Sequence, residues 1–200
     1  MISRRNISPA LRTVSLPGFL AGSILLSITV GALADDWGQL RGPARNGIST
    51  EKGWTDTWPS SGPAILWKAN VGLGFSGVSV AEGNAVTMGN ADNSDTVFCF
   101  DALTGRQVWK HTYPSSLGDK YFEGGTTGTP TIDQGRVYTL GRWGDVFCFE
   151  LNTGKILWRV PLGELEALTQ QGVPKTGSQN LGGATVTAGG LVFVAGTADE

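Results

Sequence analysis

The chain has 200 residues and a formal net charge of −2, from 15 basic and 17 acidic side chains. This mildly acidic balance argues against a nucleic-acid partner and against a surface that binds anionic membranes. Thirty glycines and only 16% charged residues indicate many tight turns and little exposed helix, so the composition predicts an all-β fold.

The first 34 residues have the pattern of a cleavable secretory signal. Three arginines precede an apolar run over residues 16–30, and Ala32 and Ala34 are the small residues that signal peptidase recognises. A membrane anchor is the alternative, but Pro17 and several glycines interrupt the run, and no basic stop-transfer flank follows it. We therefore expect cleavage after Ala34 and a periplasmic or extracellular protein with no membrane span after cleavage.

One phrase of the sequence occurs twice in register. Residues 97–110 read VFCFDALTGRQVWK and residues 146–159 read VFCFELNTGKILWR, and a shorter copy, ILWK, precedes both at 65–68. The tryptophans of the three copies are 42 and 49 residues apart. This spacing is the length of one four-stranded blade of a β-propeller with its turns.

A second repeated pattern, a short strand, a glycine turn and another strand, precedes each full copy. It occurs at 79–86 and 131–138, and again at 185–193 with one extra glycine, and it predicts three hairpins. The third copy reaches Gly196–Glu200, where the next strand would begin. We therefore expect a partial β-propeller of about two and a half to three four-stranded blades, with a ring that is not closed. The expected organisation is a signal at 1–34, an extended N-terminal segment at 35–64 and the incomplete propeller at 65–200.

The chemistry of the longer phrase explains its form. Val97–Phe100 predicts a strand that is apolar on both faces, and Asp101–Gly105 predicts a turn in which the carboxylate accepts backbone N–H groups and the glycine takes a positive φ. Trp109, on the returning strand, can cover the bare glycine of a neighbouring blade while its N–H donates to a carbonyl. Trp158 repeats this arrangement, so we expect both tryptophans to be buried blade anchors.

The two cysteines occupy equivalent positions in the two copies. Cys99 and Cys148 would therefore lie in neighbouring sheets about 10 Å apart, which is beyond the reach of a disulfide. Both are predicted to be unpaired and buried as small hydrophobic side chains.

The pattern acid-x-x-Thr-Gly-x-x-x-Trp, within Cys99–Trp109 and Cys148–Trp158, resembles the tryptophan-docking repeat of the pyrroloquinoline-quinone (PQQ) propeller superfamily. That superfamily includes PQQ-dependent alcohol and glucose dehydrogenases, an outer-membrane assembly lipoprotein and exported repeat proteins of unassigned role. The opening at 37–67 resembles the start of the last group, and the resemblance extends over residues 37–200. It implies the fold and leaves the function open, because a propeller is a scaffold that carries many kinds of site.

The segments at 158–164, 176–183 and 187–193 are together similar to the C-terminal part of PQQ-dependent glucose dehydrogenases. This similarity implies that Asn180, Gly182 and Gly183 lie near a quinone, where backbone without side chains could approach a flat cofactor. The alternative is that the two glycines form a tight strand entry, as Gly128 does in the preceding blade.

The sequence suggests neither a catalytic residue nor a metal ligand. His111, the single histidine, is expected in a surface loop. Asp92, Asn93 and Asp95 lack the spacing of a calcium loop and are interpreted as turn residues.

These observations favour an exported PQQ-like propeller protein that is a non-catalytic binding or scaffold module, or a truncated propeller. Its inter-blade loops, at 111–127 and 160–181, would contact a protein partner, and 164–170 would form a short helical turn in the second loop. The alternative is a fragment of a PQQ-dependent alcohol or glucose dehydrogenase, and only in that case would PQQ and calcium be cofactors.

Overall fold

The computed structural model describes residues 35–120, 122–173 and 176–195, so the predicted signal lies outside the described residues. The described part contains ten strands and one short helix, α1 (Glu166–Thr169). The strands are β1 (Ser79–Ala81), β2 (Asn84–Ala91), β3 (Ser94–Asp101), β4 (Gln107–Pro114), β5 (Thr131–Asp133), β6 (Arg136–Leu140), β7 (Asp145–Glu150), β8 (Ile156–Pro161), β9 (Thr185–Val186) and β10 (Val192–Phe193).

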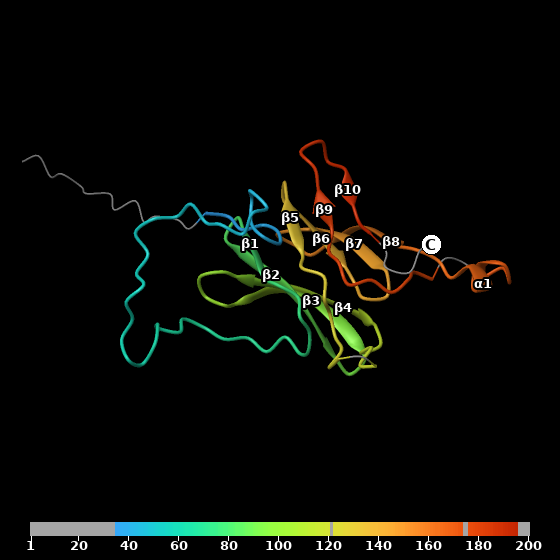
Figure 1. Cartoon of the computed structure of the whole chain (residues 1–200), viewed down its shortest axis with the longest axis horizontal. Helices are drawn as coiled ribbons and strands as arrows, with labels where there is room; N and C mark the ends of the chain where they lie inside the picture. Colours follow the sequence, from blue (N-terminus) through green and yellow to red (C-terminus); the bar gives the residue numbers. More distant parts are fainter. Residues whose placement is uncertain (1–34, 121, 174–175, 196–200) are drawn as a thin grey trace, which may run out of the picture. The chain divides into compact units, whose positions relative to one another are not determined.

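The strands form two four-stranded antiparallel sheets, in the order β1-β2-β3-β4 and β5-β6-β7-β8, and a two-stranded sheet of β9 and β10 (Figure 1). Both large sheets are simple meanders with the same register. Cys99 lies opposite Trp109 in one, Cys148 lies opposite Trp158 in the other, and each sheet has an irregularity directly after its cysteine. The structure therefore confirms an all-β, partial propeller with an open ring.

The predicted hairpins form because their turns adopt left-handed backbone. Glu82 and Gly83 have φ values of 50° and 74°, and Gln134 and Gly135 have values of 47° and 70°. Two successive positive φ values belong to the two-residue turn that matches the twist of antiparallel strands. The third hairpin has a longer turn, which includes Gly190 at φ 80°.

The repeated phrase joins one sheet to the next. We call the acid-x-x-Thr-Gly stretch after β3 or β7 the Thr-Gly turn, at 101–105 and 150–154. Trp67 donates its indole N–H to the carbonyl of Ala102, at 3.0 Å, and Trp109 donates to the carbonyl of Leu151, at 2.6 Å. Each indole also lies directly on the glycine of the same turn. Each tryptophan thus docks on the Thr-Gly turn that follows it in the sequence, as predicted.

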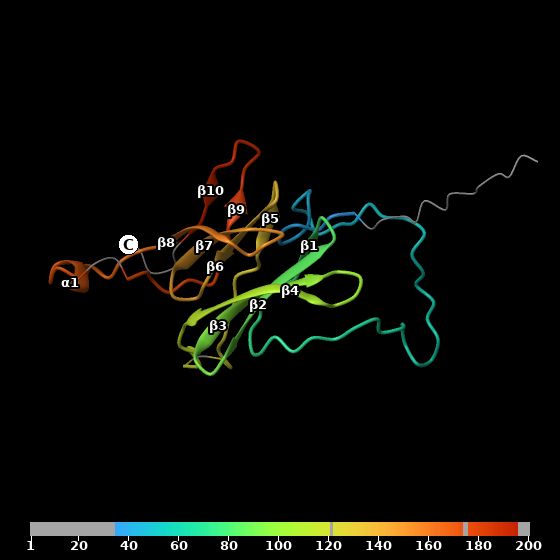
Figure 2. The same cartoon turned by 180° about the vertical axis from the view of Figure 1, so that it is seen from behind.

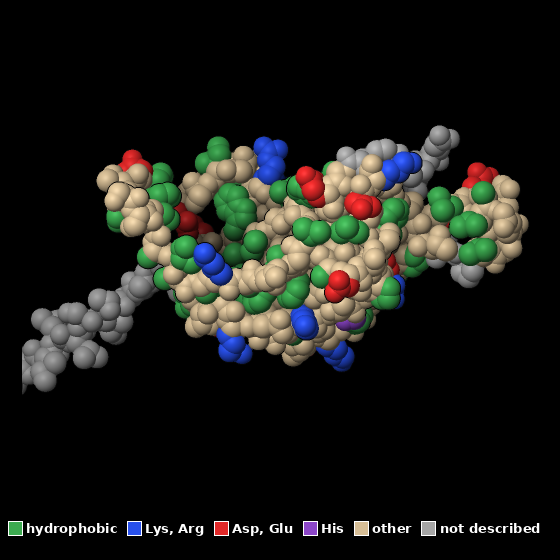
Figure 3. Space-filling view, turned by 90° about the horizontal axis from the view of Figure 1, so that it is seen from below, with side chains coloured by type: hydrophobic (Ala, Val, Ile, Leu, Met, Phe, Trp, Pro, Cys, Tyr) green, Lys and Arg blue, Asp and Glu red, His purple; other side chains and the backbone are tan. Residues whose placement is uncertain are grey.

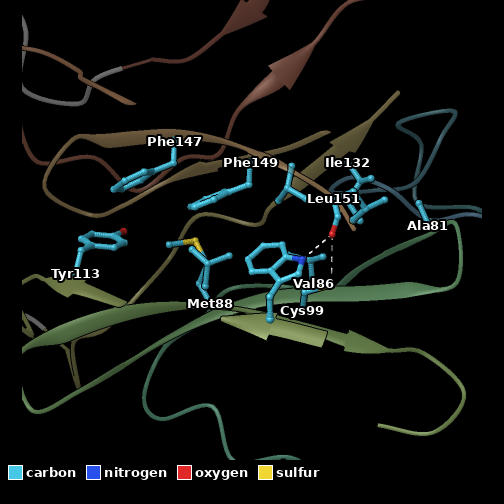
Figure 4. Packing of buried hydrophobic residues seen from close by; sticks show 12 residues of the cluster. Ala81, Val86, Met88, Cys99, Tyr113, Ile132, Phe147, Phe149 and Leu151 are labelled. Carbon is cyan, nitrogen blue, oxygen red and sulfur yellow. Dashed lines mark hydrogen bonds between the residues drawn. The ribbon is translucent and has the colours of Figure 1, made fainter. Parts of the chain in front are cut away.

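The main core lies between the two large sheets. Figure 4 shows Val86, Met88 and Cys99 of the first sheet facing Phe147 and Phe149 of the second. A smaller cluster lies on the other face of the second sheet, where its members are Tyr138, Cys148, Ala184 and Val186. The β9–β10 hairpin beside β5 and β6, visible in Figures 1 and 2, contributes to this cluster.

The prediction that Trp158 is a buried anchor is wrong, because Trp158 is exposed in the part of the chain that the structure describes. Its side chain is 37% exposed, whereas Trp109 is 8% exposed. The reason is that Trp109 has a following Thr-Gly turn to cover it, and no third Thr-Gly turn occurs in the described part of the chain.

The cysteines agree with the prediction. Cys99 and Cys148 are unpaired and buried in different sheets, and burial raises the pKa of the Cys99 thiol to about 12.

We expect the cysteines of the folded protein to react slowly with an alkylating reagent, because burial disfavours the reactive thiolate. Mass spectrometry after denaturation without prior reduction should find both thiols modified. Detection of a linked pair would contradict the placement of the cysteines in separate sheets.

The segment at 35–47 is tied to all three hairpins. Trp37 donates its backbone N–H to the carbonyl of Val80 at 2.6 Å, Ile132 donates to the carbonyl of Gly38 at 2.6 Å, and Arg45 donates from its guanidinium to the Val186 carbonyl at 2.7 Å. Residues 48–64 form no helix or strand.

Two strands extend further than the sequence interpretation expected. β4 continues to Pro114, so His111 lies in a strand and not in a surface loop, and β8 continues to Pro161. The inter-blade loops accordingly begin at residues 115 and 162 instead of 111 and 160. The predicted helical turn within 164–170 is present as α1.

Candidate functional site

The loop that leads into β9 carries the three cofactor candidates. Asn180 is 1% exposed, and it donates its backbone N–H to the Arg142 carbonyl at 2.8 Å and its side-chain amide to the Gly141 carbonyl at 2.9 Å. A Cβ on Gly183 would lie 3.0 Å from the Thr129 carbonyl oxygen, so this glycine permits close approach of two backbones. A Cβ on Gly182 would meet open space. Asn180 thus ties this loop to the turn between β6 and β7, and Gly183 lets it pass close to the backbone of Thr129.

A quinone would need an open space beside these residues. In the described residues, neither a cleft of about 390 Å³ beside the N-terminal segment nor a cavity of about 230 Å³ on the first sheet is lined by Asn180, Gly182 or Gly183. In the described part of the chain, no three His, Cys, Asp or Glu side chains lie close enough together to hold a metal ion. The cofactor role of Asn180, Gly182 and Gly183 therefore stays a prediction.

The larger cavity is a polar cleft of about 390 Å³ where the three hairpin turns meet the N-terminal segment. The turn residues Glu82, Asp133 and Thr187 line it, together with Asp36 and Arg45. Asp36 accepts the backbone N–H of Glu82 at 3.1 Å. Sequence reasoning missed this cleft, and the only available signal was that three repeated turns fall at the same end of their hairpins.

The second cavity, of about 230 Å³, lies on the face of the first sheet that points away from the second sheet. Trp67, Val71, Ala85 and Phe100 are among its apolar lining residues. Its walls are residues of the segment 67–78, which precedes β1, and residues of β2 and β3. We interpret it as part of the surface on which a preceding blade would pack.

A buried carboxylate is found where the sequence suggested only a turn. Asp92 and Asn93 do form the turn, with φ values of 51° and 55°, but Asp95 lies within β3 and is 1% exposed. It accepts hydrogen bonds from the amide of Asn90 at 2.7 Å and the hydroxyl of Ser115 at 2.8 Å. Burial nevertheless raises the pKa of Asp95, because removal from water disfavours the charged form. This network holds the end of β4 against β2 and β3.

The histidine packs among aromatic rings between the sheets. The ring centre of His111 lies 6.0 Å from that of Tyr113, 5.2 Å from Phe147 and 5.4 Å from Phe149. Burial lowers the pKa of His111, and the nearby positive charge of Arg159 lowers it further. The folded state therefore favours the neutral imidazole.

This shift predicts a pH-dependent stability. The unfolded chain binds a proton at His111 below a pKa of about 6.5, whereas the folded chain resists it, so stability is lost as the pH falls below that value. We expect the unfolding free energy of His111→Gln to fall less than that of the wild type between pH 7.5 and 5.5. The raised pKa of Asp95 acts in the opposite direction but is common to both proteins. Parallel pH profiles in urea titrations would contradict the prediction.

A comparison with family models finds a match in the C-terminal part of the chain. A family model described as "Glucose/ethanol/alcohol dehydrogenase, beta-propeller domain" matches residues 124–200. In the comparison with curated protein sequences, nothing matches this chain.

Three solved structures resemble it over part of their length. BamB from Moraxella catarrhalis is 18% identical with a TM-score of 0.33, over 43% of this chain and 23% of that chain. A europium-containing methanol dehydrogenase is 24% identical with a TM-score of 0.34, over 45% and 16% of the two chains. A quinohemoprotein alcohol dehydrogenase from Pseudomonas putida HK5 is 21% identical with a TM-score of 0.37, over 56% and 19%.

The present chain covers less than a quarter of each of these structures, and at such low scores none of them bears on function. The family match rests on sequence, and the repeated meander sheets and docked tryptophans agree with it. Together they identify residues 124–200 of this chain as a PQQ-like β-propeller domain.

Proposed function

We propose that this chain is an exported, non-catalytic propeller module that binds a protein partner through its inter-blade loops. The observation that supports this proposal is the long loop after β8. None of the residues of α1 is buried, and Leu165, Val173 and Leu181 in this loop are 50%, 36% and 53% exposed. Exposed apolar side chains on a loop of a rigid scaffold are suited to protein contacts.

The charge distribution is compatible with a protein partner. On the face shown in Figure 3, acidic and basic side chains are few and dispersed, and they form no continuous basic patch of the kind that nucleic acid requires. The one helix of the described residues, α1, has four residues. No helix in this part of the chain is long and apolar enough to cross a membrane.

The partner proposal can be tested by removing the apolar side chains. A variant with Leu165, Val173 and Leu181 all changed to Ser should lose cross-links to proteins of the host's extracytoplasmic fraction. Leu103→Ser is the matched control, because Leu103 is 76% exposed but lies in a Thr-Gly turn. The proposal fails if both variants retain the same cross-linked proteins.

The alternative function is that of a PQQ-dependent dehydrogenase fragment, and the family match at 124–200 favours it. The discriminating assay uses the purified chain with PQQ and calcium, and measures dye reduction with glucose and simple alcohols. We expect no turnover above a control without protein. Substrate-dependent turnover would replace the binding proposal with the dehydrogenase.

Export and localisation are tested separately. Mature protein from the native host, in the periplasm or the medium, should begin at Asp35 when its N-terminus is sequenced. Recovery of a membrane-bound form that retains Met1 would contradict cleavage after Ala34.

A further inference from the structure

The polar cleft of about 390 Å³ is built on the three hairpins and on the segment at 35–47 that crosses them. This segment, blue in Figures 1 and 2, lies beside β1 and β5. Asp36 accepts the backbone N–H of Glu82 in the β1–β2 turn, at 3.1 Å, and Arg45 donates from its guanidinium to the Val186 carbonyl of β9, at 2.7 Å. The two side chains are therefore fixed on different hairpins.

The charges that line the cleft are separated along it. Asp36 and Glu82 lie at the β1–β2 turn, Arg45 lies at β9, and β5 packs beside both β1 and β9. Asp133, in the hairpin between them, interacts electrostatically with Arg136. We call Asp36 and Glu82 the acidic end of the cleft and Arg45 its basic end.

The charges of the two ends are not paired with each other. Among the described residues, the one ion pair is that of Arg159 with Asp145, at 2.6 Å. One guanidinium nitrogen of Arg45 donates to Val186, and its other side-chain N–H groups have no hydrogen bond to a described residue. Glu82 takes part in hydrogen bonds through its backbone only. The cleft thus presents free carboxylate acceptors at one end and free guanidinium donors at the other.

A ligand that is complementary to both ends carries an ammonium group and a carboxylate some distance apart. An ammonium group donates to carboxylates, and a carboxylate accepts two parallel hydrogen bonds from a guanidinium. A single amino acid carries both charges on one carbon atom, whereas the two ends of the cleft belong to different hairpins. A short peptide separates its two charges, and its amide groups can bond to polar side chains between the ends, such as that of Gln134.

We propose that this cleft binds short peptides with free termini, with the peptide ammonium at Asp36 and Glu82 and the peptide carboxylate at Arg45. The volume of the cleft lies within the range of small-molecule sites. None of the residues that line it belongs to the inter-blade loops, so the inference is independent of the partner proposed for those loops.

The test is isothermal titration calorimetry of the purified protein with triglycine. Two blocked forms are the ligand controls, because N-acetyl-triglycine lacks the ammonium group and triglycine amide lacks the carboxylate. We expect triglycine to bind about tenfold to hundredfold more tightly than either form, since each loses the hydrogen bonds of one charged group.

Two variants assign the ends of the peptide. Glu82→Gln should leave the fold intact, because Gln134 occupies the same position in the next hairpin with a similar φ, 47° against 50°. This variant should weaken triglycine about tenfold and leave the affinity for N-acetyl-triglycine unchanged. Arg45→Gln should weaken triglycine by a similar factor and leave the affinity for triglycine amide unchanged. Arg106→Gln, at an exposed arginine outside the cleft, is the matched control and should change none of these affinities.

The proposal is overturned if triglycine binds no more tightly than both blocked forms, or if it does not bind at millimolar concentration. Equal affinity of the wild type and Glu82→Gln for triglycine would also overturn it. Circular dichroism checks that each variant is folded. If Arg45→Gln is unfolded, the blocked peptides and Glu82→Gln still decide the outcome.

Discussion

Replacing Trp109 with Ala is expected to lower the free energy of unfolding by about 3–5 kcal/mol, the range for truncation of a large buried aromatic. The indole is 8% exposed, its ring centre lies 5.5 Å from that of Phe149, and it covers Gly154. Truncation also removes the 2.6 Å hydrogen bond from the indole N–H to the Leu151 carbonyl (Figure 4). The carbonyl oxygen then lacks this donor in a buried position. Urea titration monitored by circular dichroism measures the loss.

The same truncation at Trp158 should cost much less, on the order of 1 kcal/mol, because cavity and transfer costs both scale with burial. Trp54→Ala, at a side chain that is 74% exposed, is the control and should change stability little. Equal losses for the three variants would mean that the repeated tryptophans do not anchor one sheet to the next.

The second large effect is expected at Gly154, and a matched glycine separates its two causes. Gly154 and Gly135 both have φ of +70°, so Ala at either position costs about 1–2 kcal/mol in backbone strain. At Gly135 the added Cβ meets nothing within 4 Å, whereas at Gly154 it lies 2.5 Å from Cδ2 of Trp109. We therefore expect Gly154→Ala to lose a further amount of about 1–3 kcal/mol by overpacking.

A double-mutant cycle tests this explanation. In a Trp109→Ala background the collision is absent, and the cost of Gly154→Ala should fall to that of Gly135→Ala. If the cost of Gly154→Ala is the same with and without the indole, backbone strain alone explains the glycine and the docking contact is unimportant.

The features that repeat in the sequence were predictable. The Thr-Gly turn forms because the Asp101 carboxylate accepts the backbone N–H and hydroxyl of Thr104, at 2.9 and 2.8 Å, which are contacts within four residues. The docking of Trp109 on the next Thr-Gly turn followed from the repeat, because a tryptophan and a turn glycine recur at intervals of one blade. Local chemistry and periodicity were sufficient for both.

Features that depend on a specific distant partner were not predictable. Asp95 and His111 are polar residues near turns. The adjacent sequence does not indicate that either side chain packs between the two large sheets. Arg45 reaches the carbonyl of Val186, 141 residues away, and this contact helps to build the polar cleft. The interpretation of Trp158 failed for a related reason, because the burial of each tryptophan is decided by the blade that follows it.

This forward direction of docking has a consequence for the order in which the chain acquires its structure. The strands of each sheet are neighbours in sequence and can pair as soon as they emerge, but Trp109 must wait for Leu151, 42 residues later. Protein synthesis adds about 5–20 residues per second, so the Trp109 indole of the first sheet would remain uncovered for roughly 2–8 seconds. A nascent chain interrupted in this interval would expose an apolar face, and such intermediates are the natural targets of chaperones.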